Sequence, residues 1–176
     1  MTAPPPSLER LDVRLVRWMA HNGVTLLRIS LGIIFLWFGA LKFFPGMSPA
    51  DELAARTIAR LSGGTVGPDL SLPILAAWES AIGLGLLFGV FLRAVLLLLG
   101  LQMIGTLTPL VLFPAETFTR IPWAPTLEGQ YIIKNAVLIS AAIVIGATVR
   151  GGGLVAEPEV LEAAEQLEEA DPVDAR

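Results

Sequence analysis

The sequence contains no cysteine and only one histidine, His21, among its 176 residues. It therefore cannot form a disulfide, a thiol redox pair or a cysteine-containing metal site, and it lacks the two histidines of a bis-histidine haem. Charged residues are scarce at 16%, whereas 54% of the residues are hydrophobic. This composition leaves too little polar surface for a water-soluble globule. We therefore expect the bilayer to be the solvent of this chain.

The two ends of the chain differ from its middle. Residues 1–7 include three consecutive prolines and are expected to form an extended lead. In residues 8–21, apolar side chains recur at helical spacing while Arg10, Arg14 and Arg17 fall on another face, which predicts an interfacial amphipathic helix. Residues 157–176 hold eight of the 16 acidic residues and predict a flexible acidic tail.

Four apolar runs are each long enough to cross a hydrocarbon core of ~30 Å at ~1.5 Å per helical residue. They lie at about residues 24–44, 73–92, 94–113 and 131–149. The second and third are joined only by the turn around Arg93, so we expect an antiparallel hairpin. The predicted fold class is all-α, an integral membrane four-helix bundle. Its domains are an N-terminal region at 1–23, the four-helix domain at 24–150 and the tail at 151–176.

The basic residues are unevenly divided between the two sides of the predicted membrane. The side that holds both termini has Arg10, Arg14, Arg17, Arg28, Arg93 and Arg150, and the opposite side has Lys42, Arg56, Arg60, Arg120 and Lys134. The positive-inside rule therefore predicts a multi-pass protein of the cell membrane with both termini in the cytoplasm. We expect Arg28, four residues into the first span, to extend its guanidinium to lipid phosphates.

The loop after the first span carries the residues of a helix start. Ser48, Pro49, Asp51 and Glu52 match a cap, a first turn and acids that suit the helix dipole. We expect this external loop to form a short helix that lies as a lid over the bundle. The segment at 113–130, with three prolines, is expected to be an ordered external loop without a helix.

Small residues repeat every four positions along the second span. Ala77, Ala81, Gly85 and Gly89 form a stripe that lets helix backbones approach closely. We expect it to serve packing within one chain rather than a dimer interface.

Ionisable residues inside apolar runs are the strongest functional candidates, because a charge at the membrane centre costs ~2.5 to 3.5 kcal/mol. We expect Glu79, Lys42 and Lys134 to fall in the outer third of the membrane and to converge. Other residues of the same half complete a candidate site for a ligand or a proton: Trp37, Trp78, Gln102, Thr106, Tyr131 and Asn135. A mostly apolar cavity with a few polar groups suits an amphiphile, and a carboxyl in low dielectric can carry a proton. The alternative is a buried ion pair that only fixes helix register.

The apolar spans also carry a resemblance to a known family. The run LRISLGIIFLWFGALKFF at residues 27–44 resembles the opening of DoxX-type membrane proteins. The runs WESAIGL at 78–84 and LEGQYIIKN at 127–135 are similar to the second and fourth helices of that group. The resemblance covers residues 26–149 and implies a small four-helix membrane fold with Lys42, Glu79 and Lys134 as its polar landmarks. The group includes subunits named for quinol-linked oxidation and members tied to oxidative stress.

Three functions are compatible with these features. The first is an accessory subunit of a membrane redox or oxidative-stress system, with a quinone or similar amphiphile as candidate ligand and a membrane complex or a second copy as candidate partner. Without haem ligands or cysteines, we expect no electron transfer or catalysis by this chain alone, and no nucleic-acid partner. The second is a non-catalytic membrane scaffold or assembly factor. The third, suggested by Glu79, is a small proton-linked transporter.

Overall fold

The computed structural model describes residues 6–154, with side chains from Leu11 onward. The predicted acidic tail and most of the proline-rich lead lie outside the described residues. The chain divides into two units, one of residues 1–26 with 150–176 and one of residues 27–149. Each unit is described by itself.

The N-terminal unit is helical over its described residues 6–26, which begin helix α1 (Pro6–Leu41). Leu11, Leu15, Trp18 and Met19 are each about half exposed, in agreement with the predicted apolar face. The helix does not end at Gly23, so the boundary predicted between residues 23 and 24 is not a helix end.

Among residues 6–154, four helices are long and apolar enough to cross a membrane. They are Leu11–Leu41 within α1, α3 (Pro68–Phe88), residues Leu92–Leu112, which combine α4 (Leu92–Leu107) and α5 (Pro109–Leu112), and α7 (Leu127–Thr148). Only 17% to 39% of each apolar window is buried inside the protein. The remaining apolar side chains are therefore available to lipid, as expected where the bilayer is the solvent. The predicted all-α membrane bundle is confirmed.

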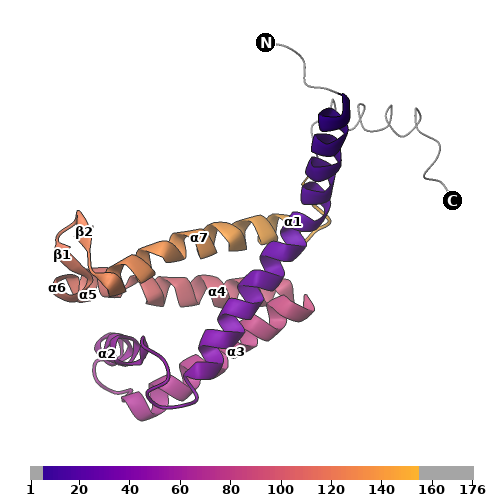
Figure 1. The fold of residues 1–176 in the computed structure, drawn as a ribbon. Helices are drawn as coiled ribbons and strands as arrows, with labels where there is room; N and C mark the ends of the chain where they lie inside the picture. The colour runs from indigo at the N-terminus through magenta and orange to yellow at the C-terminus, as the bar shows by residue number, and fades with distance from the viewer. Residues whose placement is uncertain (1–5, 155–176) are drawn as a thin grey trace. The chain divides into compact units, whose positions relative to one another are not determined.

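The unit of residues 27–149 has its core where three helices meet. Helix α4 packs against both α3 and α7 and lies between them in Figure 1. Ile82 and Leu86 of α3, Leu99 of α4 and Ile145 of α7 are each at most 1% exposed. Close packing of these side chains therefore joins α3, α4 and α7.

Helix α3 begins five residues earlier than the sequence analysis predicted. Pro68 occupies its first turn, with Gly67 as the N-cap and Asp69 as a first-turn acid, whereas Pro73 lies inside the helix. Both prolines are compatible with an α-helix here, because a proline in the first turn loses no intrahelical hydrogen bond and Pro73 removes only one. The helix therefore begins at Pro68, and the prediction that it begins at Pro73 is wrong.

A tight turn joins α3 to α4, which confirms the predicted hairpin. Gly89 has a φ of 68°, and its N–H donates to the carbonyl of Gly85, as in a left-handed helix cap. Phe91 also has a positive φ, of 50°, and is 86% exposed. A phenylalanine in this conformation costs ~1 kcal/mol or more, so the short connection stores some backbone strain.

The lid is formed by helix α2 (Asp51–Leu61), which packs against α3 and α5. Its N-cap is Ala50, without a side-chain hydrogen bond, so the prediction that Ser48 caps it is wrong. Arg56 pairs with Glu116 and lies 4.8 Å from the centroid of the Phe113 ring. The hydrogen bond with Glu116 raises the pKa of Arg56, and the ion pair ties the lid to the neighbouring segment.

The segment between α5 and α7 is more regular than predicted. It contains a single helical turn, α6 (Pro114–Thr117), followed by the antiparallel strands β1 (Phe118–Arg120) and β2 (Ala124–Pro125). The backbone N–H of Thr126 donates to the carbonyl of Thr117 at 2.9 Å, and its side chain caps α7 by accepting from the N–H of Gly129. These local hydrogen bonds explain how a proline-rich stretch is ordered.

Candidate functional site

Glu79 lies near the middle of α3, about eleven residues or ~16 Å from its first residue, Pro68. It lies six residues after Pro73, the predicted start of the helix. Its side chain is 11% exposed, and it is one of the buried residues of α3.

Three helical segments bring polar side chains to this carboxylate. Lys42, directly after α1, places its Nζ 2.6 Å from Oε2 of Glu79, and its side chain is 7% exposed. Gln102 of α4 donates from Nε2 to Oε1 of Glu79 at 2.8 Å. Lys42 also donates to the backbone carbonyl of Phe38 at 3.3 Å. We call Lys42, Glu79 and Gln102 the Glu79 cluster; both carboxylate oxygens of Glu79 accept a hydrogen bond within it.

Glycines allow α1 and α3 to cross closely enough for this cluster to form. A Cβ added to Gly39 of α1 would lie 2.8 Å from Cβ of Glu79, and one added to Gly83 of α3 would collide with the backbone of Leu36. The predicted small-residue stripe is only partly right. Gly85 is buried against Val95, whereas Ala77 and Ala81 are exposed. The close approach to α1 is made by Gly83 instead, because its absent side chain admits a neighbouring backbone.

Asp51, the first residue of α2, is a polar residue that the sequence pattern did not single out as a site residue. Both of its carboxylate oxygens are buried and have no hydrogen-bond partner among the described residues. Helix α2 packs against α3, the helix that carries Glu79. Asp51 does occupy the predicted first turn of a helix, but the spacing of residues carried no signal that its side chain turns inward.

Two residues of the predicted site lie next to the cluster without touching Glu79. Thr106 donates from its hydroxyl to the backbone carbonyl of Gln102 at 2.9 Å, one turn along α4. Trp78 donates from its indole nitrogen to the carbonyl of Leu98 at 3.2 Å. The Thr106 contact lies within α4, whereas the Trp78 contact joins α3 to the backbone of α4 and so helps to fix the two helices side by side.

The predicted site residues of α7 do not join the cluster. Lys134 is exposed, with its Nζ 5.4 Å from the centroid of the Tyr131 ring, and Tyr131 itself is 64% exposed. Asn135 donates to the backbone carbonyls of Tyr131 and Ile132 on its own helix. The expectation that both lysines converge on Glu79 is therefore wrong for Lys134, because the rotation of α7 points this side chain outward.

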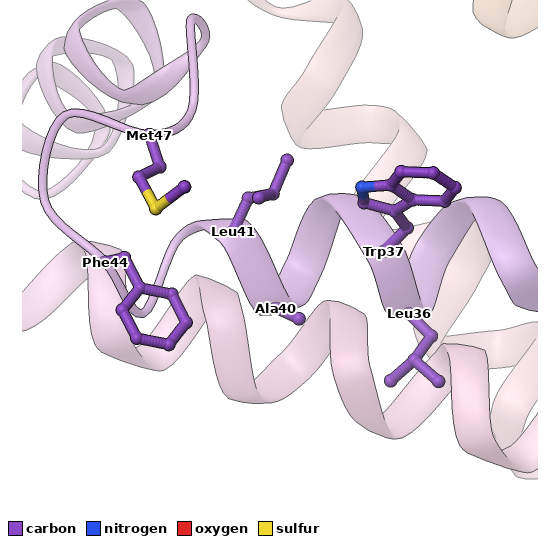
Figure 2. Close-up of a pocket in the computed structure, with 6 residues that line it drawn as sticks. All are labelled: Leu36, Trp37, Ala40, Leu41, Phe44 and Met47. Atoms are coloured by element: carbon purple, nitrogen blue, oxygen red, sulfur yellow. The ribbon is translucent and has the colours of Figure 1, made fainter.

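Trp37 lines an apolar groove of about 500 Å³ beside the last turns of α1. Figure 2 shows the six lining residues: Leu36, Trp37, Ala40, Leu41, Phe44 and Met47. Trp37 and Leu41 lie on the opposite side of α1 from Phe35, which is only 5% exposed and packs into the bundle. The groove therefore lies away from Glu79, and Trp37 is not part of the cluster.

Arg28 has a structural role at the other end of α3. Its guanidinium donates to the carbonyls of Leu86 and Leu87, the latter at 3.1 Å, and lies against Gly89. A cation at a helix C-terminus satisfies carbonyls that lack an intrahelical partner and favours the helix dipole. The prediction that Arg28 only reaches out to lipid phosphates is thus corrected, because its side chain caps a helix of the same chain.

A family model for DoxX matches residues 23–115, which is more than half of the chain. The chain belongs to the DoxX family. The match ends before α7, short of the residues 26–149 over which the resemblance was expected. Lys42, Asp51, Glu79 and Gln102 all lie inside the DoxX region, whereas Tyr131, Lys134 and Asn135 lie outside it. No curated protein and no solved structure matches this DoxX chain.

The Glu79 cluster supplies hydrogen-bond donors and a carboxylate acceptor. Residues 6–154 contain no group of three or more His, Cys, Asp or Glu side chains able to hold a metal ion. The cluster offers an ammonium and an amide as donors and a carboxylate as acceptor, all within membrane-spanning helices or at their ends. Such a set can bind the polar head of an amphiphile or exchange a proton.

Proposed function

We propose that this DoxX protein is an accessory subunit of a membrane redox or oxidative-stress system and that the Glu79 cluster receives the head of a quinone or a similar amphiphile. The observation that supports the proposal is the meeting of Lys42, which follows α1, with Glu79 of α3 and Gln102 of α4. Buried polar groups are costly within a bilayer, so a cluster of three at this depth is a functional candidate.

The donors and acceptor of the cluster match the two redox states of a quinone. Quinone carbonyls accept hydrogen bonds, which Lys42 and Gln102 can donate once they turn from Glu79. The hydroxyls of the reduced form donate, and the carboxylate of Glu79 can accept. Because the chain has no cysteine and one histidine, electrons would come from a partner protein in the membrane.

The test is to purify the full chain gently from its native membrane and to identify bound quinones and proteins by mass spectrometry. We expect a stoichiometric quinone that is lost in Glu79→Gln, which removes the charge with little change of shape. Glu52→Gln is the matched control, because it removes the same charge from a side chain that is 86% exposed. A preparation that shows no saturable quinone binding would refute the proposal that the ligand is a quinone.

A second candidate function is a non-catalytic scaffold or assembly factor. It is favoured by the fact that both oxygens of Glu79 are already satisfied by Lys42 and Gln102, as in a purely structural ion pair. A reproducible protein partner that co-purifies without a quinone, and that is retained in Glu79→Gln, would support this function over the first.

We also propose that both termini lie in the cytoplasm of a cell-membrane protein. Arg93, the second residue of α4 after the α3–α4 turn, is exposed, and basic residues favour the cytoplasmic side. Because the chain has no cysteine, single cysteines report orientation without interference. In intact cells, an impermeant thiol reagent should label Thr119→Cys in β1 and leave Arg93→Cys unlabelled; the reverse pattern would invert the orientation.

A further inference from the structure

The first half of α7 has an exposed face that carries a charge. The side chains of this face lie within about 60° of Lys134 around the helix axis, and all of them are exposed: Leu127, Gln130, Tyr131, Lys134 and Val137. The face ends one turn further along the helix at Ala141, which is buried. Because α7 is long and apolar enough to cross a membrane, this face is turned to lipid or to another protein.

Lys134 has no ion pair among residues 6–154. It lies seven residues, or ~10 Å, after Leu127, the first residue of α7. The acid of this helix, Glu128, is exposed and lies about 120° away from Lys134 around the axis, on another face. A cation that faces hydrocarbon is costly, so an ammonium at this position needs an anion from elsewhere.

Exposed aromatic side chains mark the membrane boundary at this end of α7. Trp123 lies in the turn between β1 and β2 and is 87% exposed, and Figure 1 shows this hairpin at the start of α7. Tryptophan and tyrosine concentrate where hydrocarbon meets the lipid headgroups. The Nζ of Lys134 lies 5.4 Å from the centroid of the Tyr131 ring, three residues earlier, so the lysine side chain extends back toward the start of the helix. A lysine takes this direction when it reaches from hydrocarbon to the headgroups.

We propose that this face of α7 binds an anionic phospholipid, with the phosphate held by Lys134 and an acyl chain lying along Val137. Lys134, Gln130 and Tyr131 all have hydrogen-bond donors, and phosphate oxygens accept. One turn further along the helix the face becomes apolar at Val137, which matches the order of head and chain in a lipid. An anionic lipid binds better than a zwitterionic one, because the latter carries its own cation beside the phosphate.

A second copy of the chain fits this face less well than a lipid does. In a two-fold dimer through this face, two parallel α7 helices would bring the two Lys134 ammonium groups to the same depth, and like charges repel. No acid lies on this face to compensate them. The site is separate from the Glu79 cluster, so the inference goes beyond the proposed function.

The test measures which lipid lies against this face of the full chain in vesicles. Because the chain has no cysteine, a bimane label can be placed at one introduced cysteine and quenched by lipids with brominated acyl chains. Val137→Cys reports on the proposed site, and Ile143→Cys is the matched control, because both residues are 68% exposed on the same helix. The vesicles are phosphatidylcholine with equal small fractions of either brominated phosphatidylglycerol or brominated phosphatidylcholine.

At position 137 we expect phosphatidylglycerol to be enriched about fivefold over phosphatidylcholine, the equivalent of ~1 kcal/mol for one lysine near a lipid surface. At position 143 the two brominated lipids should quench equally. Lys134→Met should abolish the preference at position 137, whereas Lys134→Arg should retain it, because the arginine keeps the charge and its donors.

Equal quenching by the two lipids at position 137 overturns the proposal, and this measurement needs no change at Lys134. A preference that survives Lys134→Met, or that is equally large at position 143, also overturns it. Quenching by neither lipid at position 137 would show that protein covers the face and would again overturn it. None of these variants touches Glu79, so a failure of quinone binding leaves the result unaffected.

Discussion

Replacing Lys42 by methionine tests how strongly the ion pair holds α1 to α3. The change keeps the length of the side chain and removes its charge. At a separation of 2.6 Å, the attraction is about 6 kcal/mol for an effective dielectric constant of ~20. Much of this is offset by desolvation, and breaking a buried pair typically costs ~3 to 5 kcal/mol. If Glu79 takes up a proton in this variant, it is no longer an unpaired charge, and the loss of unfolding free energy falls at the lower end of that range.

The assay is reversible unfolding of the purified protein in mixed micelles, followed by helical circular dichroism. The control is the double variant Lys42→Met/Glu79→Gln, in which no charge is left unpaired and residue 79 can still hydrogen-bond to Gln102. We expect the double variant to recover most of the stability that the single variant loses. The reasoning is wrong if Lys42→Met stays within ~1 kcal/mol of the wild type or if the double variant is no more stable than the single one.

Three further changes have clear expected results. Gly83→Ala should lower the free energy of unfolding by ~1 to 3 kcal/mol, because the added Cβ meets the α1 backbone. Gly100→Ala is the control and should be neutral or stabilising, because the space around Gly100 is open. Equal effects of the two changes would contradict the close crossing of α1 and α3. Arg28→Met should cost ~1 to 2 kcal/mol in the same assay through loss of the α3 cap, and Arg93→Met, an exposed position, should cost almost nothing. Arg56→Gln should speed amide hydrogen exchange in α2, and unchanged protection would show that the lid does not depend on this ion pair.

Hydropathy was sufficient to predict the spans, because each of the four helices is a long apolar run with few charges. It also singled out Lys42 and Glu79, since ionisable groups stand out in such runs. Gln102 was predicted only to lie in the same half of the bundle as Glu79, and its hydrogen bond to Glu79 was not predicted. These successes rest on features that are local in the sequence.

The sequence pattern did not predict how each helix is rotated about its own axis. Lys134 and Glu79 are equally plausible inward-facing charges in a linear pattern, yet the former is exposed and the latter is buried. Rotation is set by which small residues let backbones approach, and here Gly39 and Gly83 decide the α1–α3 crossing. Asp51 was missed for a related reason, since its inward position depends on how the lid packs rather than on its neighbours in the chain.

The order of the paired charges along the chain has a consequence for biosynthesis. Lys42 is made 37 residues before Glu79 and stands just beyond the end of its helix, where an ammonium can remain in water while the first span enters the membrane. The carboxylate, which sits at mid-span and costs more to insert alone, arrives when a counter-ion is already in place. Helix α1 can therefore enter the membrane first, and Lys42 then lowers the cost of inserting the carboxylate of α3.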